Sequence, residues 1–309
     1  MTLESDLKAQ AKQLGFDLVG IAPAELPTHY GQQLERWLAL GRHGEMAYMA
    51  RAPWRRADPR AVLPGARSIV SLGMNYYPGD HGQAPHDGCG KIARYAWGQD
   101  YHALIEPKLD ALADWLHARA PGTQVKRYVD HGPVLERAAA QEAGLGFIGK
   151  NTMLITDAFG SWVFLAELLT TLELAPDRPQ TSQCGSCRLC LDACPTGAIV
   201  APYELDATRC ISYLTIELRR DFTESEQRAL GNWFFGCDVC QEVCPYNHPP
   251  TVTGEPALLH GAGPWMDLHR IAGMHTDDDT APLAGTPLAR PKRAGLTRNA
   301  LAALADQER

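Results

Sequence analysis

The sequence predicts an α/β domain over residues 1–175, a cysteine-rich domain over 176–250 and a short, irregular to helical tail over 251–309. Three observations support this organisation. Helix-like and strand-like segments alternate first, a polar stretch rich in proline interrupts them at 173–183, and eight of the nine cysteines lie between positions 184 and 244. A chain of 309 residues is long enough for two domains and at least one large core.

The spacing of apolar residues predicts the individual elements. Apolar side chains recur at helical spacing over 3–14 and 101–116, a short helix is expected from Pro133, and a final helix over 297–309. Strands are expected over 17–22, 67–74, 124–130, 152–156 and 161–170, with a turn at 159–160 between the last two. The order of these strands in a sheet cannot be read from the sequence.

Composition and charge exclude some classes of protein. Apolar residues make up 45% of the chain and charged residues 21%, as in ordinary globular proteins. The first residues carry acids and no apolar run, so we expect no signal peptide, no membrane span and a cytoplasmic location. The net charge of −7 argues against unspecific coating of nucleic acid, although basic runs occur at 51–67 and 286–300. Taken alone, each run reads as a solvated surface.

The cysteines follow a spacing that is typical of bacterial [4Fe–4S] ferredoxins. The first run is C-x2-C-x2-C-x3-C and the second C-x2-C-x3-C, each followed by proline; Phe234 stands where a further cysteine would be, and Cys210 is its replacement. Three thiolates wrap three corners of one cluster, and the fourth cysteine ligates the other cluster. The rule predicts a ferredoxin-like domain with two clusters, the first held by Cys184, Cys187, Cys190 and Cys244, the second by Cys194, Cys210, Cys237 and Cys240.

Structural zinc is the alternative, because C-x2-C pairs also bind zinc. Zinc takes four ligands for each site and does not require the complete run, so the spacing favours iron–sulfur clusters. Cys89 stands apart from the other cysteines and is expected to be a free thiol.

Residues 144–149, GLGFIG, match a dinucleotide-binding pattern, and Lys150 extends it towards a phosphate-binding loop. A dinucleotide fingerprint follows a strand and opens a helix, whereas here a helical stretch comes first and a strand follows. The phosphate loop needs Ser or Thr after the lysine, and Asn151 is there instead. We therefore reject NAD and ATP and expect a tight loop that lies close to a cofactor.

Several blocks together resemble epoxyqueuosine reductase: RYAWGQDYH at 94–102, the stretch from YVDHGP to GKNT at 128–152, RCISYLTIE at 209–217, both cysteine runs and residues 285–304. The resemblance covers nearly the whole chain. It implies that the α/β domain binds cobalamin, that two [4Fe–4S] clusters accompany it, and that epoxyqueuosine at the wobble position of tRNA is reduced to queuosine. The epoxide oxygen would leave as water, and an external low-potential donor would supply electrons one at a time through the clusters to cobalamin.

The resemblance also implies functional residues. Asp130 would be the proton donor, with helix capping as the alternative role and His131 as the second candidate for the acid. Contacts to cobalamin are expected from Arg56, Asp130, Lys150, Asn151, Ser212, Tyr213 and Val239. Contacts to the tRNA anticodon loop, whose bases can be splayed into a pocket, are expected from Arg219, Arg220, Arg290, Lys292, Arg293 and Arg298.

Two other functions are also compatible with these sequence motifs. A reductive dehalogenase would use the same cofactors on a small organohalide, although such enzymes usually carry an export signal. An electron carrier without its own substrate would not need 175 residues of α/β domain ahead of its clusters. We expect a monomer, since nothing in the sequence indicates an obligate dimer.

Overall fold

The computed structural model describes residues 2–308, so Met1 and Arg309, at the ends of the predicted first domain and tail helix, lie outside the described residues. The main sheet has four strands, each antiparallel to its neighbours. Their order is β1 (Leu18–Pro23), β2 (Ser68–Asn75), β7 (Val163–Thr170) and β4 (Val125–Tyr128). Each lies within two residues of its predicted ends.

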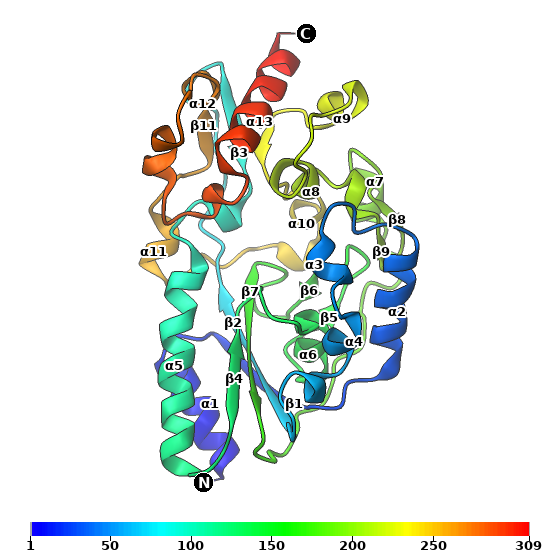
Figure 1. The fold of residues 1–309 in the computed structure, drawn as a ribbon, viewed down its shortest axis with the longest axis vertical. Coiled ribbons are helices and arrows are strands. Elements are labelled where there is room, and N and C mark those ends of the chain that lie inside the picture. The colour runs from blue at the N-terminus through cyan, green and yellow to red at the C-terminus, as the bar shows by residue number, and fades with distance from the viewer. Residues whose placement is uncertain (1, 309) are drawn as a thin grey trace.

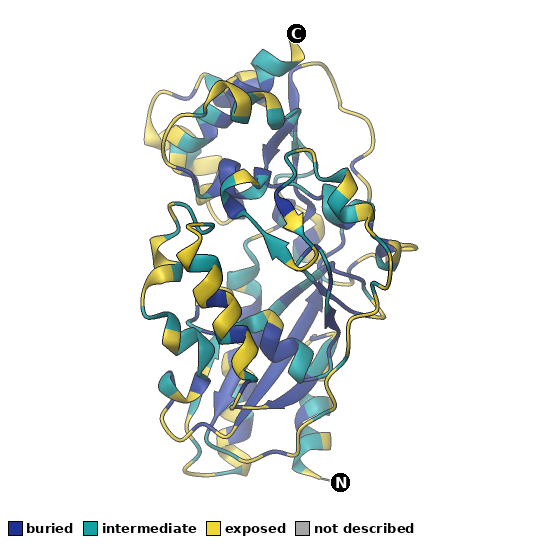
Figure 2. Ribbon diagram, turned by 90° about the vertical axis from the view of Figure 1, so that its right-hand side faces the viewer, coloured by how far each residue is buried: buried dark blue, intermediate teal, exposed yellow. Residues whose placement is uncertain are grey.

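Helices cover both faces of this sheet, which is why all eight residues of β2 are buried (Figures 1 and 2). On one face α1 (Leu3–Gln13) and α5 (Tyr101–Arg119) bury an apolar stripe, including Leu109, Leu112 and Leu116. On the other face lie α2 (Thr28–Ala39) and α6 (Glu136–Glu142). The alanines at 138–140 of α6 are buried, and their small side chains let the helix lie close to the sheet. This α/β arrangement agrees with the predicted fold class.

Two predicted elements differ from the structure. The strand expected over 152–156 shortens to β6 (Leu154–Ile155) and pairs with β5 (Phe147–Ile148), not with β7. The turn of this hairpin is closed by hydrogen bonds from the N–H of Gly149 to the carbonyl of Met153 and from the N–H of Thr152 to the carbonyl of Gly149, both 2.9 Å. The helix expected from Pro133 begins at Glu136, because residues 130–133 form bends that carry Asp130.

The cysteine runs lie on short elements joined by turns, beside the main sheet (Figure 1). Two short helices carry cysteines of the runs, and a third begins just after Cys210. The elements of this region are α7 (Leu189–Ala193), β8 (Ile199–Ala201), β9 (Glu204–Leu205), α8 (Ile211–Ile216), α9 (Glu224–Ala229) and α10 (Val239–Glu242). Further short helices are α3 (Ala47–Ala50), α4 (Pro53–Ala57) and α11 (Pro256–Leu259).

A second sheet joins segments that are far apart in the chain. In it β3 (Cys89–Ile92) lies between β10 (Trp233–Phe235), to which it is parallel, and β11 (Trp265–Asp267), to which it is antiparallel. This sheet shares a core with α12 (Leu268–Ala272) and α13 (Lys292–Gln307). The tail helix thus begins five residues before its predicted start. No helix within residues 2–308 is long and apolar enough to cross a membrane.

Candidate active site

The structure brings the seven cysteines of the two runs, together with Cys210, into two groups. Burial and the nearby Cys184 and Cys244 raise the pKa of Cys190. Burial, together with Cys237, raises the pKa of Cys240 well above its ordinary range. Cysteines that raise one another's pKa form two groups. The first group is Cys184, Cys187, Cys190 and Cys244, and the second is Cys194, Cys210, Cys237 and Cys240. The grouping agrees with the spacing, and the assignment of each cysteine to a cluster stays a prediction.

Both groups fit a cluster. The first group, Cys184, Cys187, Cys190 and Cys244, lines a cavity of about 100 Å³. In the second, the backbone N–H of Ala198 donates to Sγ of Cys194 at 3.3 Å, the kind of N–H contact that stabilises thiolate ligands. Thiolates are the ligands that iron–sulfur clusters take, so the donor chemistry agrees with the prediction.

The loop between β5 and β6 holds the first cysteine run in place. Nζ of Lys150 donates to the carbonyl oxygens of Gly185 and Cys187 at 2.6 and 2.8 Å. Asn151 is buried, and its side-chain amide donates to the carbonyl of Cys240 at 3.3 Å. Both side chains are therefore engaged with the cysteine loops, and their contact with a corrin stays a prediction.

A buried arginine holds the second cysteine run. Arg94 is 6% exposed, and its backbone N–H and Nη1 donate to Oδ2 of Asp238 at 2.8 and 3.1 Å. Its Nη1 also donates to Glu242 at 2.6 Å. Burial raises the pKa of Asp238 to about 6, and Arg94 opposes this rise. Arg94 thereby ties α10, which carries Cys240, to the segment that follows β3.

Asp130 lies on the loop after β4, with its side chain exposed. The hydroxyl of Tyr101 donates to its Oδ2 at 2.7 Å, and its backbone N–H donates to Oε1 of Glu136 at 2.6 Å. Its φ of 58° is in the left-handed region, which an aspartate adopts only when its surroundings require it. Leu135 occupies the cap position of α6, so helix capping, the alternative role for Asp130, is wrong. His131 is 54% exposed and 3.9 Å from Glu106.

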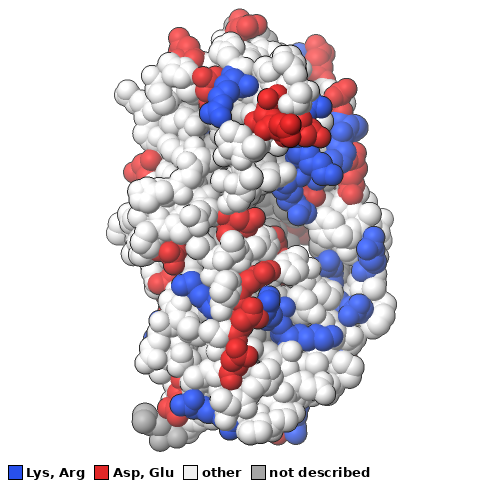
Figure 3. Space-filling view, turned by 60° about the vertical axis from the view of Figure 1, so that its left-hand side comes forward, with Lys and Arg blue, Asp and Glu red and all other residues white. Residues whose placement is uncertain are grey.

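Residues from three other segments lie near the Asp130 loop: α3, the segment after β3 and the segment before α13. Asp130 acts electrostatically on Arg290, and the guanidinium of Arg290 lies 5.9 Å from the ring centre of Tyr48. Burial raises the pKa of Tyr95, and Asp130 adds to the rise. Figure 3 shows a hollow in the middle of one face, with Lys and Arg side chains gathered along its upper edge. Asp130 thus interacts with residues outside the main sheet and its helices, namely Tyr95 after β3 and Arg290 before α13.

Arg56, on α4, contacts the same loop from the main-sheet side. Its Nη1 donates to the carbonyl of Gly132 at 3.0 Å and its Nη2 to that of Tyr48 at 3.2 Å. Burial lowers the pKa of Arg56, and its Nε is buried without a partner among residues 2–308. An unpartnered buried donor is costly, so Arg56 has a position open for a ligand acceptor.

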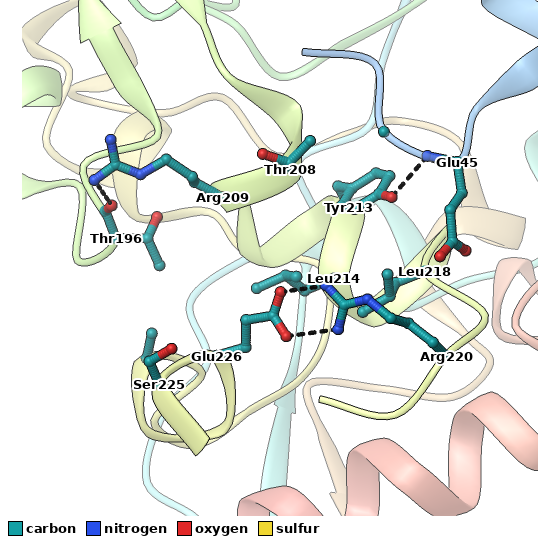
Figure 4. Close-up of a pocket in the computed structure, with 12 residues that line it drawn as sticks. Glu45, Thr196, Thr208, Arg209, Tyr213, Leu214, Leu218, Arg220, Ser225 and Glu226 are labelled. Carbon is teal, nitrogen blue, oxygen red and sulfur yellow. Dashed lines mark hydrogen bonds and ion pairs between the residues drawn. The ribbon is translucent and has the colours of Figure 1, made fainter. Parts of the chain in front are cut away.

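The remaining residues expected at the corrin lie on α8 and α10. Val239 is the first residue of α10, and Ser212 is the second residue of α8, close to Cys210, where it opposes the rise in the Cys210 pKa that burial causes. The hydroxyl of Tyr213 accepts the backbone N–H of Glu45 at 2.8 Å (Figure 4). Tyr213 lines a cavity of about 630 Å³ that includes neither Asp130 nor any cysteine. The large cavity is therefore separate from the chemistry of Asp130.

Three of the basic residues expected to bind tRNA lie before or at the start of α13. Arg290 is 53% exposed and its Nε donates to Glu217 at 2.6 Å. Nε of Arg293 donates to Asp277 at 3.0 Å, and Lys292 is exposed. All three keep N–H groups that can reach phosphate oxygens.

The other three lie near the end of α8. Arg220 is paired with Glu226 through two hydrogen bonds of 2.7 and 2.8 Å, and Arg219 is exposed. Arg298 donates to three backbone carbonyls and stacks on Phe222, with the guanidinium 4.2 Å from the ring centre. Arg298 is thus committed to holding the end of α8 on α13, and its contact with tRNA stays a prediction.

Sequence reasoning missed two acids and the role of one tyrosine. Tyr101 was expected only as the start of a helix with apolar spacing, yet its hydroxyl donates a hydrogen bond to Asp130. Glu136 and Glu167 were not singled out. Glu167 was detectable, because it is the one charged residue in the apolar strand 163–170. An acid at a buried strand position needs a partner, and that need is a signal.

Comparisons with known proteins agree with this site. The family described as epoxyqueuosine reductase QueG, DUF1730, matches residues 56–131, and a 4Fe-4S double cluster binding domain matches residues 183–247. The epoxyqueuosine reductase of Cellulophaga algicola is 41% identical, covering 96% of this chain and 96% of the relative. That of Gloeobacter violaceus is 42% identical, covering 97% and 95%.

Solved structures are similar over the same extent. A crystal structure of epoxyqueuosine reductase with an epoxyqueuosine-modified stem loop of tRNA-Tyr superposes with a TM-score of 0.91 at 34% identity, covering 99% of this chain and 82% of that one. The Bacillus subtilis epoxyqueuosine reductase, with its catalytic loop swung out of the active site, gives 0.91 at 32% identity over the same shares.

An α/β domain joined to a double-cluster domain defines an iron–sulfur oxidoreductase. The sequence identity of 41–42% to epoxyqueuosine reductases over nearly the whole chain shows the family: the chain belongs to the epoxyqueuosine reductase family. Iron–sulfur clusters, not structural zinc, are the metal centres of the cysteine region. The electron-carrier and dehalogenase alternatives are not favoured.

Proposed function

We propose that this protein reduces epoxyqueuosine in tRNA to queuosine by removing the epoxide oxygen as water. The observation that carries the proposal is the carboxyl group of Asp130, oriented by Tyr101 and by the contact of its backbone with Glu136, in a chain that also brings both cysteine sets together. The balance of the reaction is epoxide plus two electrons and two protons, giving alkene and water. The protein must therefore supply a proton at the oxygen and a path for electrons.

Asp130 supplies the proton. Tyr101 donates to Oδ2, and no residue within 2–308 hydrogen bonds to Oδ1, so Oδ1 is the atom that carries and delivers the proton. The hydrogen bond from the Asp130 N–H to Glu136 fixes the backbone, so the carboxyl group meets the substrate in one orientation. Tyr101 stabilises the aspartate that remains once the proton has moved.

The cysteine sets provide the electron path. Leu189, which lines the cavity of the first set, is 50% exposed, so this set lies close to the surface of the protein. We therefore expect an external low-potential donor to deliver electrons at the first set and the second set to pass them inward.

Cobalamin is the group that the family implies between the clusters and the substrate. The buried, unpartnered Nε of Arg56 fits it, because corrin amide side chains carry carbonyl acceptors. When bound, cobalamin supplies a two-electron centre, while the protein provides orientation and protons. Arg56, the Asp130 loop and Val239 would hold it.

The substrate is a tRNA, and the exposed basic residues would hold its phosphates. Arg290 interacts electrostatically with Asp130, so we expect a phosphate held at Arg290 to bring the flipped wobble base towards the acid. Arg219, Arg220, Lys292 and Arg293 extend the basic surface. We expect the protein to act as a monomer in the cytoplasm, where this tRNA is processed.

The test is turnover of epoxyqueuosine-containing tRNA by protein purified without oxygen and reconstituted with iron, sulfide and cobalamin. Nucleoside mass spectrometry should show the loss of one oxygen. Asp130→Asn should abolish turnover with both clusters and cobalamin retained, and the matched control Asp114→Asn, an exposed acid on α5, should not. Full cofactor loading without any change in the nucleoside would refute the function.

A further inference from the structure

A buried acid lies in the middle of the main sheet. Glu167 of β7 is fully buried, and neither of its carboxylate oxygens has an N–H or hydroxyl donor among residues 2–308. In the register it lies opposite Ser71 of β2 and Tyr128 of β4. Tyr128 is the last residue of β4, so Glu167 lies at the level where the chain leaves the sheet towards Asp130.

The partner of Glu167 is a second acid. α6 packs on β7, and Glu136, the first residue of α6, is the acid whose carboxyl group acts directly on that of Glu167. Two carboxylates cannot hydrogen bond unless one of them carries a proton. Burial followed by Asp130 raises the pKa of Glu136 to about 7, and burial followed by Glu136 raises that of Glu167 well above its ordinary range. The pair therefore keeps a proton at neutral pH.

The charged groups around the pair do not replace this proton. Asp130 adds a further negative charge. Arg137 is next to Glu136 in α6, but its Nη1 donates to the carbonyl of Thr152. Arg56, on α4, interacts with Glu136 only through space. Without the proton, the negative charges of Glu136 and Glu167 would face each other beside a fully buried carboxylate.

The pair also holds the loop. Oε1 of Glu136 accepts the backbone N–H of Asp130 at 2.6 Å, and Asp130 has the left-handed φ of 58°. For a residue other than glycine that conformation is unfavourable, so it persists only where hydrogen bonds such as this one hold it.

We propose that Glu136 and Glu167 form a proton-sharing pair that positions the loop of Asp130. Glu136 is the positioning residue, and Glu167 holds Glu136 in place through the shared proton. While the proton is present, the loop is held with Asp130 facing the substrate. When it is lost at higher pH, repulsion moves Glu136 away and releases the Asp130 N–H. The catalytic meaning of this release rests on the proposed function; the holding of the loop does not.

Glutamine substitution separates the proton from the hydrogen bonds. In Glu136→Gln the side-chain oxygen can accept the Asp130 N–H while the amide donates to Glu167, so both contacts remain without a dissociable proton. Glu136→Ala removes both contacts. Glu142→Gln, at the other end of α6, is the matched control, because its contact with the hydroxyl of Tyr30 is far from the loop.

The first readout is amide hydrogen exchange of residues 128–135 in the reconstituted holoenzyme without tRNA, between about pH 6 and 9. Relative to Glu136→Gln at the same pH, the wild-type loop should lose about tenfold in protection as the pH rises, and Glu136→Ala should lack the protection throughout. Glu142→Gln should follow the wild type. Equal protection in the wild type and Glu136→Ala would overturn the proposal.

The second readout is turnover of the tRNA. Glu136→Ala should lower kcat by about tenfold with KM little changed, and Glu136→Gln should restore kcat and remove the alkaline decline. If Glu136→Ala does not fold, the wild type is compared with Glu136→Gln alone. Identical pH profiles of hydrogen exchange in these two proteins would overturn the proposal. A wild type that exchanges as expected but does not turn over would refute the proposed function alone.

Discussion

Replacing Arg94 by methionine should destabilise the protein through the second cysteine run. Methionine keeps most of the apolar stem and removes a guanidinium that is 6% exposed. Asp238, which is 1% exposed, then keeps the backbone N–H of residue 94 but loses its charged partner, and Glu242 loses a contact of 2.6 Å. Removing one partner of a buried ion pair costs about 3–5 kcal/mol. Because Glu242 is 33% exposed and can be resolvated, we expect about 3 kcal/mol.

The measurement is thermal unfolding of the reconstituted protein under anaerobic conditions, with iron content determined at each temperature. A loss of about 3 kcal/mol should lower the apparent midpoint by about 5–10 °C. Arg60→Met is the matched control, since Arg60 is 45% exposed and its ion pairs with Glu25 and Asp58 contribute about 1 kcal/mol or less. The double variant Arg94→Met with Asp238→Asn should recover part of the loss. Equal midpoints for Arg94→Met and Arg60→Met would refute the reasoning.

Three more predictions concern the surroundings of the site. Gly44→Ala should lower stability by about 2 kcal/mol in denaturant titrations, because φ is 56° and the new Cβ would lie 2.3 Å from the hydroxyl of Tyr213. The hydrogen bond from Arg220 lowers the pKa of Glu226 to about 2, so its contribution is present above about pH 4.5 and is lost as the pH falls towards 2. Glu226→Gln should therefore be about 1 kcal/mol less stable at neutral pH and equal to the wild type near pH 2. Tyr101→Phe should lower kcat by about tenfold in the tRNA assay, because the hydroxyl then no longer orients the catalytic carboxyl group.

Three strands of the main sheet, β1, β2 and β7, were predictable because each is a mainly apolar run next to turn residues, and β4 (VKRY) because valine and tyrosine favour strands. Their order was not, because pairing such as Ser68 with Thr170 depends on contacts a hundred residues apart. The short strand β3 was missed for the same reason. Its four residues have little pattern of their own, and only β10 and β11 on either side make them a strand.

The part of the site that was predictable is the cysteine region, because the spacing of cysteines along the chain limits which of them can bind the same cluster. Ligands two and three residues apart can reach one cluster, so the cysteine sets follow from counting positions. The cooperation of Glu136 and Glu167 could not be read in this way, since 31 positions separate them and only the fold brings a helix start onto a central strand. For Lys150 and Asn151 the sequence predicted only that their loop lies near the site. It did not reveal that their side chains contact the cysteine loops.

The position of β3 between β10 and β11 also affects how the molecule is made. A ribosome finishes residues 89–92 long before residues 233–235 and 265–267, so the growing chain holds this strand without either neighbour. Arg94, directly after β3, cannot meet Asp238 until that sheet closes. Loading of the second cluster is consequently among the last events of biogenesis, and a cell must keep eight reactive thiols from oxidation until synthesis is complete.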